Sequence, residues 1–297
     1  MEAFKERYKE RLNKLRITDI GFEDYYLIHD LACNKTKTHN LDQFYIRESM
    51  KAAYFYAIYN DGKLNELFLK YPRKFVDYLS QFDSIFTTNY DSNIESVTKT
   101  QIYHIHGQFD KKSEVFNAAS LRNQLPDAPI KDSVIDETYF YLYSNAVSTY
   151  CGQYKEIQLK QYSQANVALE KSVIAYNNNP EIHKEIDSWT KSKNIMIANM
   201  GHMVQIKAAN PNISFNDNYY FDRLKEIKGT LDILGLSSWN DFHIFESIDS
   251  SDIDNCTFYY YRSEECETIK KILPILYANN KLNLLPGKKF WEDNNEN

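Results

Sequence analysis

Two short segments of the chain carry an amide, a carboxylate and an imidazole at places where strands are expected to end. The first segment reads Phe86-Thr87-Thr88-Asn89-Tyr90-Asp91, and the second, further along, reads Ile105-His106-Gly107. A hydrogen-bonding amide, a carboxylate and a titratable imidazole in one crevice suffice for base-assisted attack on a sugar carbon. We therefore expect Asn89, Asp91 and His106 to be the catalytic residues.

Two predicted strands position these groups. The apolar run before Thr87 indicates a short buried strand that ends in a polar turn. Residues 102–107 alternate apolar and polar side chains and stop at Gly107, which indicates a second strand. In open α/β sheets, ligands bind in the crevice beyond the carboxyl ends of the strands. Because His104 and His106 are two residues apart, both are expected on the same face of their strand.

The last quarter of the chain has the alternation of strands and helices that produces a parallel sheet. Its expected elements are, in order, a strand at 229–236, a polar turn at 237–241, a helix at 242–248, a strand at 256–261 and a helix at 266–277. Asn240 or Asp241 is available to cap the first of these helices, and Ser263 the second. Pro274 should kink the second helix or end it early.

The rest of the chain is predicted to be mostly helical. Apolar residues recur at helical spacing in 1–15, 24–33, 41–59, 64–79, 136–177 and 181–190, with a break near Pro72 and a turn signal at Asn60-Asp61-Gly62. Residues 110–135 are polar and indicate a loop. The chain is therefore predicted to have three parts. Residues 1–112 form the first part of the core with N-terminal helices, residues 113–215 form a mostly helical insertion, and residues 216–297 form the second part of the core.

Composition narrows the class of protein. The chain has 297 residues and a formal net charge of −6, with acidic and basic residues interspersed. This balance argues against a nucleic-acid-binding protein that works through a global positive field. Eight Gly and seven Pro disfavour an all-β protein with many tight turns and favour long helices.

Cysteine usage and hydropathy indicate the compartment. The four Cys form no Cys-x-x-Cys pair, and no apolar run approaches the ~18 residues of a membrane span. The first residues, Met-Glu-Ala-Phe-Lys-Glu-Arg, contain no apolar signal core. We therefore expect a cytoplasmic protein with reduced thiols, no membrane partner and no bound metal.

Three pieces of the sequence together resemble one family. Thr87-Thr88-Asn89-Tyr90-Asp91 resembles the Asn-containing pentapeptide of sirtuins and sirtuin-like defence proteins, and Ile105-His106-Gly107 resembles their His-Gly element. The stretch from Gly229 to Asp241 resembles the later strand whose serine loop touches the adenosine half of NAD. Within this stretch the chain reads Leu-Gly-Leu-Ser-Ser-Trp-Asn-Asp, and this segment is most similar to that of the bacterial abortive-infection AbiH and sirtuin-like branch. The resemblance covers residues 82–110 and 218–280.

The resemblance implies an α/β fold with a Rossmann-like parallel sheet and cleavage of NAD at the nicotinamide–ribose bond. Asn89 would orient the ribose or a water molecule, Asp91 would support the nicotinamide pocket, and His106 would be the general base on a ribose hydroxyl. Ser237 would contact the adenosine side. The implied contacts to NAD, which is the substrate, also include Thr87, Thr88, Gly107, Gly235, Ser238 and Asp241.

The implied biology is NAD hydrolysis in bacterial antiphage defence by abortive infection. An unrestrained NAD hydrolase is toxic to its own cell, so control by homo-oligomer assembly or by a phage-derived trigger protein is expected. The helical insertion lies where it could close over the crevice.

The chain departs from the family in two ways. No Gly-x-Gly turn that would cradle a pyrophosphate is present, and nothing reproduces the four-Cys zinc module of sirtuins, which argues against a protein deacylase. Either the chain is shortened at its start, or the phosphates are held in another way, or NAD is not bound. The alternative function is therefore a catalytically silent relative that binds nucleotides or regulates a partner. A nuclease-like or other nucleotide-processing enzyme on the same scaffold is a third option.

Simpler structural interpretations stand beside these. Asn89 and Asp91 could form an ordinary turn, with Asp91 capping a following helix. The family match favours His106 over His104, which is then a packed or surface histidine; a His-x-His metal pair is the rival interpretation, for which no third ligand is evident. Asp241 and His243 could reach the crevice, or could be a helix cap and a surface histidine.

Overall fold

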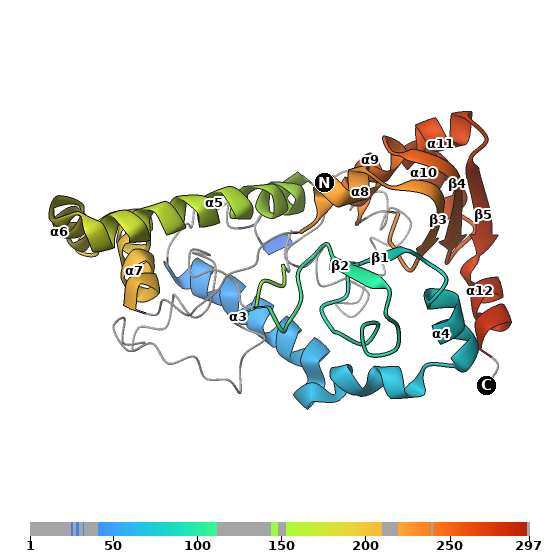
Figure 1. Cartoon of the computed structure of the whole chain (residues 1–297), viewed down its shortest axis with the longest axis horizontal. Helices are drawn as coiled ribbons and strands as arrows, with labels where there is room; N and C mark the ends of the chain where they lie inside the picture. Colours follow the sequence, from blue (N-terminus) through green and yellow to red (C-terminus); the bar gives the residue numbers. More distant parts are fainter. Residues whose placement is uncertain are drawn as a thin grey trace.

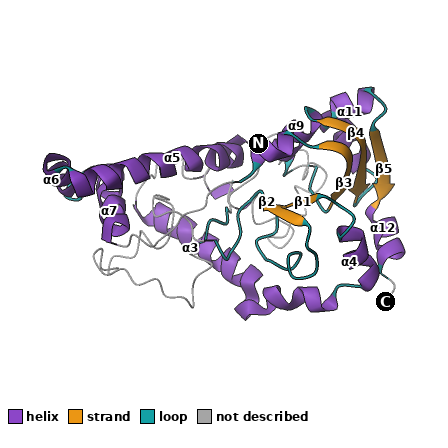
Figure 2. Ribbon diagram, in the orientation of Figure 1, coloured by secondary structure: helices purple, strands orange, loops and turns teal. Residues whose placement is uncertain are grey.

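The computed structural model describes residues 25, 28–29, 32, 41–111, 144–147, 153–209, 219–238 and 240–295. They form a mixed α/β protein with two parallel sheets (Figure 2). Strands β1 (Ser84–Thr87) and β2 (Gln101–His104) pair in parallel as one sheet. Strands β3 (Lys228–Leu234), β4 (Asp252–Tyr260) and β5 (Leu282–Pro286) form the other, in the order β3-β4-β5. The α/β class and the parallel pairing are confirmed, but in the described part of the chain the strands lie in two sheets rather than one.

The three-stranded sheet follows the predicted strand–helix alternation. Helix α8 (Phe221–Lys225) precedes β3, and α9 (Phe242–Asp249) connects β3 to β4. Helices α10 (Glu265–Ile272) and α11 (Pro274–Ala278) connect β4 to β5, and α12 (Gly287–Asn294) follows β5. Pro274 has no N–H to continue α10, so it begins a new helix instead, as its position predicted. The predicted cap at Ser263 is wrong: the carboxylate of Glu265 accepts from the backbone N–H groups of Tyr261 and Arg262.

One buried cluster joins the two sheets. Ile105, directly after β2, is 1% exposed and belongs to the same core as residues of β3, β4 and the helices α9–α11. Phe86 of β1 packs against this core as well. The buried members of the cluster are Ile105, Leu224, Ile233, Ile244, Phe245, Ile248, Ile253, Cys256, Phe258, Ile269, Leu273 and Leu276. Burial of this apolar set fixes the ends of β2 and β3 relative to each other.

The N-terminal helical segments lead to a contact with the three-stranded sheet. Helix α3 (Leu41–Tyr59) has the predicted bounds, and a left-handed turn at Asn60-Asp61-Gly62 separates it from the rest of the 3₁₀ segment η2 (Asn60–Lys70). Pro72 then precedes α4 (Arg73–Leu79). The Tyr78 hydroxyl donates to Asp232 Oδ2 at 2.5 Å, which ties α4 to β3. The helices predicted at 1–15 and 24–33 lie almost wholly outside the described residues.

The described part of the predicted insertion contains three helices that pack together. They are α5 (Gln153–Asn178), α6 (Pro180–Trp189) and α7 (Ile195–Ala209). Their shared core is Leu169, Val173, Ile186, Met203, Val204 and Ile206. In Figure 1 they extend to the left, away from β3–β5 on the right. Residues 144–147 are not helical, so the single helix predicted for 136–177 is wrong over that stretch; its other residues before 153 lie outside the described ranges.

Among the residues that the structure describes, no helix combines the length and the apolar character that crossing a lipid bilayer requires.

Candidate functional site

The turn after β2 holds His106 in a buried position. The Ile105 N–H donates to the Thr87 carbonyl at 2.9 Å, and the Val147 N–H donates to the His106 carbonyl at 2.9 Å. Gly107 follows with φ of 79°, and a Cβ there would collide with the backbone of Asn145. Only glycine fits such a position, because it combines a left-handed conformation with close backbone contact. The backbone on both sides of His106 is therefore fixed.

His106 meets a second histidine that comes from the other sheet. The Nε2 atoms of His106 and His243 lie 3.0 Å apart, and the two rings stack with centroids 5.2 Å apart. Both side chains are almost completely buried, at 3% and 2% exposed. His243 occupies the first turn of α9, directly after the polar loop that follows β3. The interpretation of His243 as a surface histidine is wrong.

Asp241 completes a three-residue group with these histidines. Donor atoms of His106, Asp241 and His243 all lie within 4.8 Å of one another. The Asp241 carboxylate accepts from the Ser237 N–H at 2.9 Å through Oδ2. Asp241 stands at the N-cap position of α9 but makes no side-chain cap bond there, so the predicted capping role is wrong. Its carboxylate instead closes the loop between β3 and α9.

The predicted serine loop is compact and mostly polar. The Asn240 N–H donates to Ser237 Oγ at 3.2 Å, and the Asp241 N–H donates to the Ser237 carbonyl at 3.1 Å. Gly235, with φ of 71°, begins the loop after β3. The Ser238 Oγ is buried without a hydrogen-bond partner among the described residues. The loop therefore places Gly235, Ser237, Ser238 and Asp241 together beyond the carboxyl end of β3.

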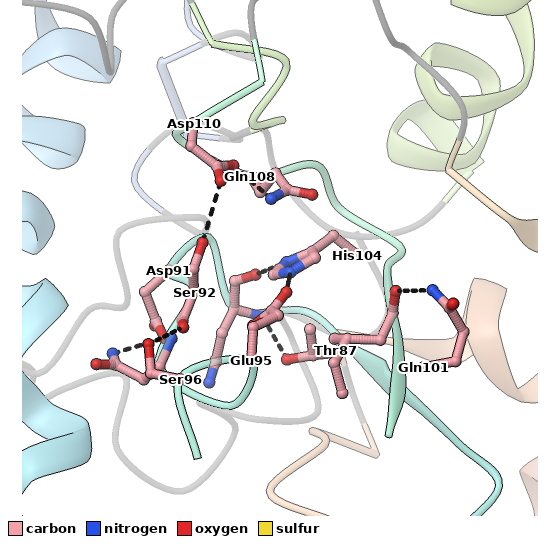
Figure 3. A network of polar contacts seen from close by, with 12 residues as sticks. Thr87, Asp91, Ser92, Glu95, Ser96, Gln101, His104, Gln108 and Asp110 are labelled. Carbon is pink, nitrogen blue, oxygen red and sulfur yellow. Dashed lines mark hydrogen bonds and ion pairs between the residues drawn. The ribbon is translucent and has the colours of Figure 1, made fainter. Parts of the chain in front are cut away.

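His104 faces a different set of partners from His106. Its Nδ1 lies 2.8 Å from the Asn89 carbonyl and its Nε2 lies 2.6 Å from Glu95 Oε1 (Figure 3). The Asn89 carbonyl can only accept a hydrogen bond, so Nδ1 donates to it, and the carboxylate beside Nε2 favours the doubly protonated ring. The expectation that His104 and His106 share one strand face is wrong, because β2 ends at His104 and the chain turns at once. The two histidines are not a metal pair.

Charge pairing stabilises the charged form of His104. Burial acts to lower the pKa of His104, but the hydrogen bonds to Glu95 and to the Asn89 carbonyl outweigh it, so the pKa lies above its ordinary value. Burial acts to raise the pKa of Glu95, and the hydrogen bond from His104 reverses this, so its pKa lies below the ordinary value. His104 is therefore a structural residue that holds the backbone of Asn89.

Asp91 also has a structural role in the loop. Its Oδ1 accepts from the N–H and from the side-chain amide of Asn93, at 3.0 and 2.6 Å. Asn93 in turn donates to the Leu64 carbonyl and accepts from the Phe68 N–H. The helix predicted to begin at Asp91 is replaced by turns over residues 93–97, so its capping role is wrong. Asp91 acts as a side-chain-stabilised turn residue.

The segment after β1 presents Asn89 at its surface. Thr87 Oγ1 accepts from the Asn89 N–H at 3.1 Å, so the bonds that fix Asn89 are made by its backbone. The Asn89 side chain is exposed and Thr88 is half-buried. In the described part of the chain, the hydrogen bonds of Asn89 and Asp91 named above run to their own loop and to His104, whereas His106 contacts His243.

Proton transfer is the chemistry that the histidine pair supports best. Two imidazoles joined through their Nε2 atoms share one hydrogen, and a neutral pair can take up one further proton at a ring nitrogen. The Asp241 carboxylate lies beside this pair, so the three side chains form one polar group. Three donor atoms of these types can also bind a metal ion.

For His243 the sequence left two alternatives open, a position in the crevice or a surface histidine, and it was not among the predicted catalytic residues. It lies two residues after Asp241, at the start of the helix that follows the carboxyl end of β3. Titratable residues in the first turn after such a strand belong to the crevice where α/β proteins bind ligands, and this position is the signal that could have identified it. Comparisons of the chain with models of protein families, with curated proteins and with solved structures gave no match.

Proposed function

We propose that the protein hydrolyses the nicotinamide–ribose bond of NAD at the carboxyl ends of β2 and β3. The observation that carries this proposal is the buried contact between His106 and His243, whose Nε2 atoms are 3.0 Å apart beside Asp241. A base that can take up one proton is the group that this reaction requires. The sirtuin-like resemblance of the segments containing Asn89, His106 and Ser237 supplies the substrate class.

The reaction follows from the positions of these groups. The histidine pair accepts the proton of a ribose hydroxyl, and the alkoxide stabilises the positive charge that develops as the C1′–nitrogen bond breaks. The bonding electrons leave with nicotinamide. Water then bonds to C1′ and returns a proton to the alkoxide, so the net proton released leaves through the histidine pair. Orientation of the substrate and one base account for most of the rate enhancement in such a reaction.

The other parts of the site bind the substrate in this proposal. Asn89 presents its exposed amide to the nicotinamide ribose, while its backbone is held by His104. The loop of Gly235, Ser237 and Ser238 binds the adenosine side, and the buried Ser238 hydroxyl is a group that a ligand could satisfy. Asp91 supports the Asn89 loop through Asn93 rather than contacting nicotinamide itself.

The alternative function is a catalytically silent nucleotide-binding or regulatory subunit. Two observations favour it: the sequence has no glycine-rich phosphate turn, and the contacts of Asp91 are those of a turn residue. In either case we propose a cytoplasmic protein. For the NAD hydrolase we also propose control by self-assembly or by a phage-derived trigger, since free NAD hydrolysis would harm the host cell.

Nicotinamide release from NAD tests the proposal. The full chain is incubated with NAD and a chelator, beside the variants His106→Ala and Asn89→Ala and the control His183→Ala on the exposed face of α6. Release by the parent chain and the control, with loss in both site variants, supports the enzyme. No release at any protein concentration, together with an NAD-dependent thermal shift, supports the silent subunit. No release and no thermal shift contradict both functions.

A further inference from the structure

His106, Asp241 and His243 have the geometry of a metal site, and we propose that they bind a divalent transition-metal ion, with Zn²⁺ as the best match. The donor atoms of the three side chains lie within 4.8 Å of one another. His106 lies in the turn after β2, and the other two residues lie at the start of α9, which follows β3. This proposal does not depend on NAD hydrolysis. It concerns what the same three side chains bind when no nucleotide is being cleaved.

The distance between the two histidines is close to that of a metal site. A tetrahedral ion with imidazole nitrogens at about 2.0–2.1 Å holds those nitrogens about 3.3–3.4 Å apart. The Nε2 atoms of His106 and His243 are 3.0 Å apart. On binding, the shared hydrogen moves to the Nδ1 atom of its ring. The rings then separate by a few tenths of an ångström and turn, so that both Nε2 atoms face an ion that lies beside the line joining them.

Asp241 supplies the third donor with little movement. Its carboxylate belongs to the same group of donors within 4.8 Å, and rotation about its Cβ–Cγ bond, which is a soft torsion, brings an oxygen into range. The Ser237 N–H holds Oδ2 at 2.9 Å and so orients the carboxylate. Hydrogen bonds of this kind from outside the ligand set raise metal affinity in known sites. Asp241 is half-buried, so the ion can enter from its side.

The backbone around the ligands is already fixed, which lowers the cost of binding. Ile105 is in the main core, Gly107 lies against Asn145, and the Val147 N–H holds the His106 carbonyl. His243 is in the first turn of α9 between the buried residues of that helix and the serine loop. The fixed backbone limits the adjustment on binding to small movements of the three side chains.

The donor set selects the class of ion. Two imidazoles and one carboxylate, with a position left for water, suit Zn²⁺ and related first-row ions. Mg²⁺ and Ca²⁺ prefer oxygen ligands, so they should not compete. An ion bound to both Nε2 atoms also occupies the atoms that share the proton in the proposed hydrolysis. Metal binding and base catalysis by His106 therefore exclude each other, and Zn²⁺ should inhibit nicotinamide release.

Titration of the metal-stripped full chain with Zn²⁺, followed by calorimetry, tests the site. We expect one ion per chain, no heat with Mg²⁺, and at least tenfold weaker binding in His243→Gln and in Asp241→Asn. His183→Ala, which removes an exposed histidine of α6, should bind as the parent does. Unchanged thermal unfolding of each variant shows that the fold is kept. Co²⁺ should give the intense visible absorption bands of a low-coordinate site in the parent chain but not in His243→Gln.

The outcomes separate this proposal from the proposed function. Zinc uptake that is absent, or that is equal in the parent and in His243→Gln, would overturn the metal site. If one zinc ion binds per chain and no condition gives nicotinamide release, the metal site is supported and the proposed NAD hydrolase is contradicted. If the chain releases nicotinamide at a rate that zinc does not change, and binds no zinc, the NAD hydrolase is supported and the metal site is contradicted.

Discussion

His106 and His243 are 137 positions apart in the sequence, and their Nε2 atoms lie 3.0 Å apart in the fold. Each histidine stands just beyond the carboxyl end of a strand, His106 after β2 and His243 after β3. The buried cluster that contains Ile105 and Ile233 holds these two strand ends together. The contact between the histidines is therefore a consequence of the core that joins the two sheets.

Replacing Asn89 should affect catalysis without affecting the fold. Its hydrogen bonds to His104 and Thr87 use backbone atoms, so Asn89→Ala keeps them. We expect a change in unfolding free energy within about 0.5 kcal/mol and a fall of more than about tenfold in nicotinamide release. Urea unfolding and the release assay measure the two effects. An unchanged release rate would remove Asn89 from the site.

Gly107 should be far less tolerant of a side chain than Gly229. Both have positive φ, but a Cβ at Gly107 would meet the Asn145 backbone, while at Gly229 nothing lies within 4 Å. We expect Gly107→Ala to cost more than about 2 kcal/mol, against about 1 kcal/mol for Gly229→Ala, which has only the backbone strain. Equal losses in denaturant unfolding would show that the contact with residue 145 does not constrain the turn.

The His104–Glu95 pair should make stability depend on pH in a defined window. The pKa of His104 is raised in the folded state, so its contribution to the free energy of unfolding is complete below its unfolded-state pKa of 6.5. This contribution is lost as the pH rises through the folded-state pKa. The pKa of Glu95 is lowered in the folded state, so its contribution to the free energy of unfolding is present above its unfolded-state pKa of 4.5. This contribution is lost as the pH falls through the folded-state pKa. The pair should therefore stabilise the fold most at pH values between these two unfolded-state pKa values.

Glu95→Gln checks this window. Relative to the parent, the variant should lose more unfolding free energy at a pH between the unfolded-state pKa values of Glu95 and His104. It should lose less at a pH well above the raised pKa of His104. Thermal unfolding at the two pH values gives the comparison. The same loss at both would mean that the His104–Glu95 contact is not a charged pair.

Asp249 should stabilise the start of α11. Its carboxylate accepts from the backbone N–H groups of Ile275 and Leu276 at 3.0–3.1 Å, although it belongs to α9. We expect Asp249→Ala to cost about 1–2 kcal/mol, the usual loss for a helix cap. Asp254→Ala, an exposed change on β4, should stay within about 0.5 kcal/mol. Similar losses in the two variants would contradict the capping role.

Local patterns in the sequence predicted much of the secondary structure. The bounds of α3 agree with its periodicity, and Pro274 separates α10 from α11 as expected because proline cannot continue the hydrogen-bonded helix. β5 and α12 were not predicted, since Leu282–Pro286 is short and is followed by a Pro-Gly pair that resembles a turn. Short elements depend on burial against partners that the local sequence does not identify.

The site was predictable only in part, for the same reason. A strand in the segment that leads to His106, and a polar loop after the strand that begins at 229, followed from local patterns. The strand was expected to include His106, whereas β2 ends at His104. The different partners of His104 and His106 did not, because they depend on the turn at Gly107 packing against Asn145. The burial of His243 against His106 results from the shared core of two distant strand pairs. Such contacts are tertiary, and no periodicity within either segment encodes them.

The rate of nicotinamide release from NAD by the parent chain and by His243→Gln, both freed of metal, tests the central claim most directly. If the two histidines act together as the base, the parent releases nicotinamide and the variant is slower by about a hundredfold or more. Release at the same rate by both proteins, or no release by the parent at any NAD concentration, would contradict the account.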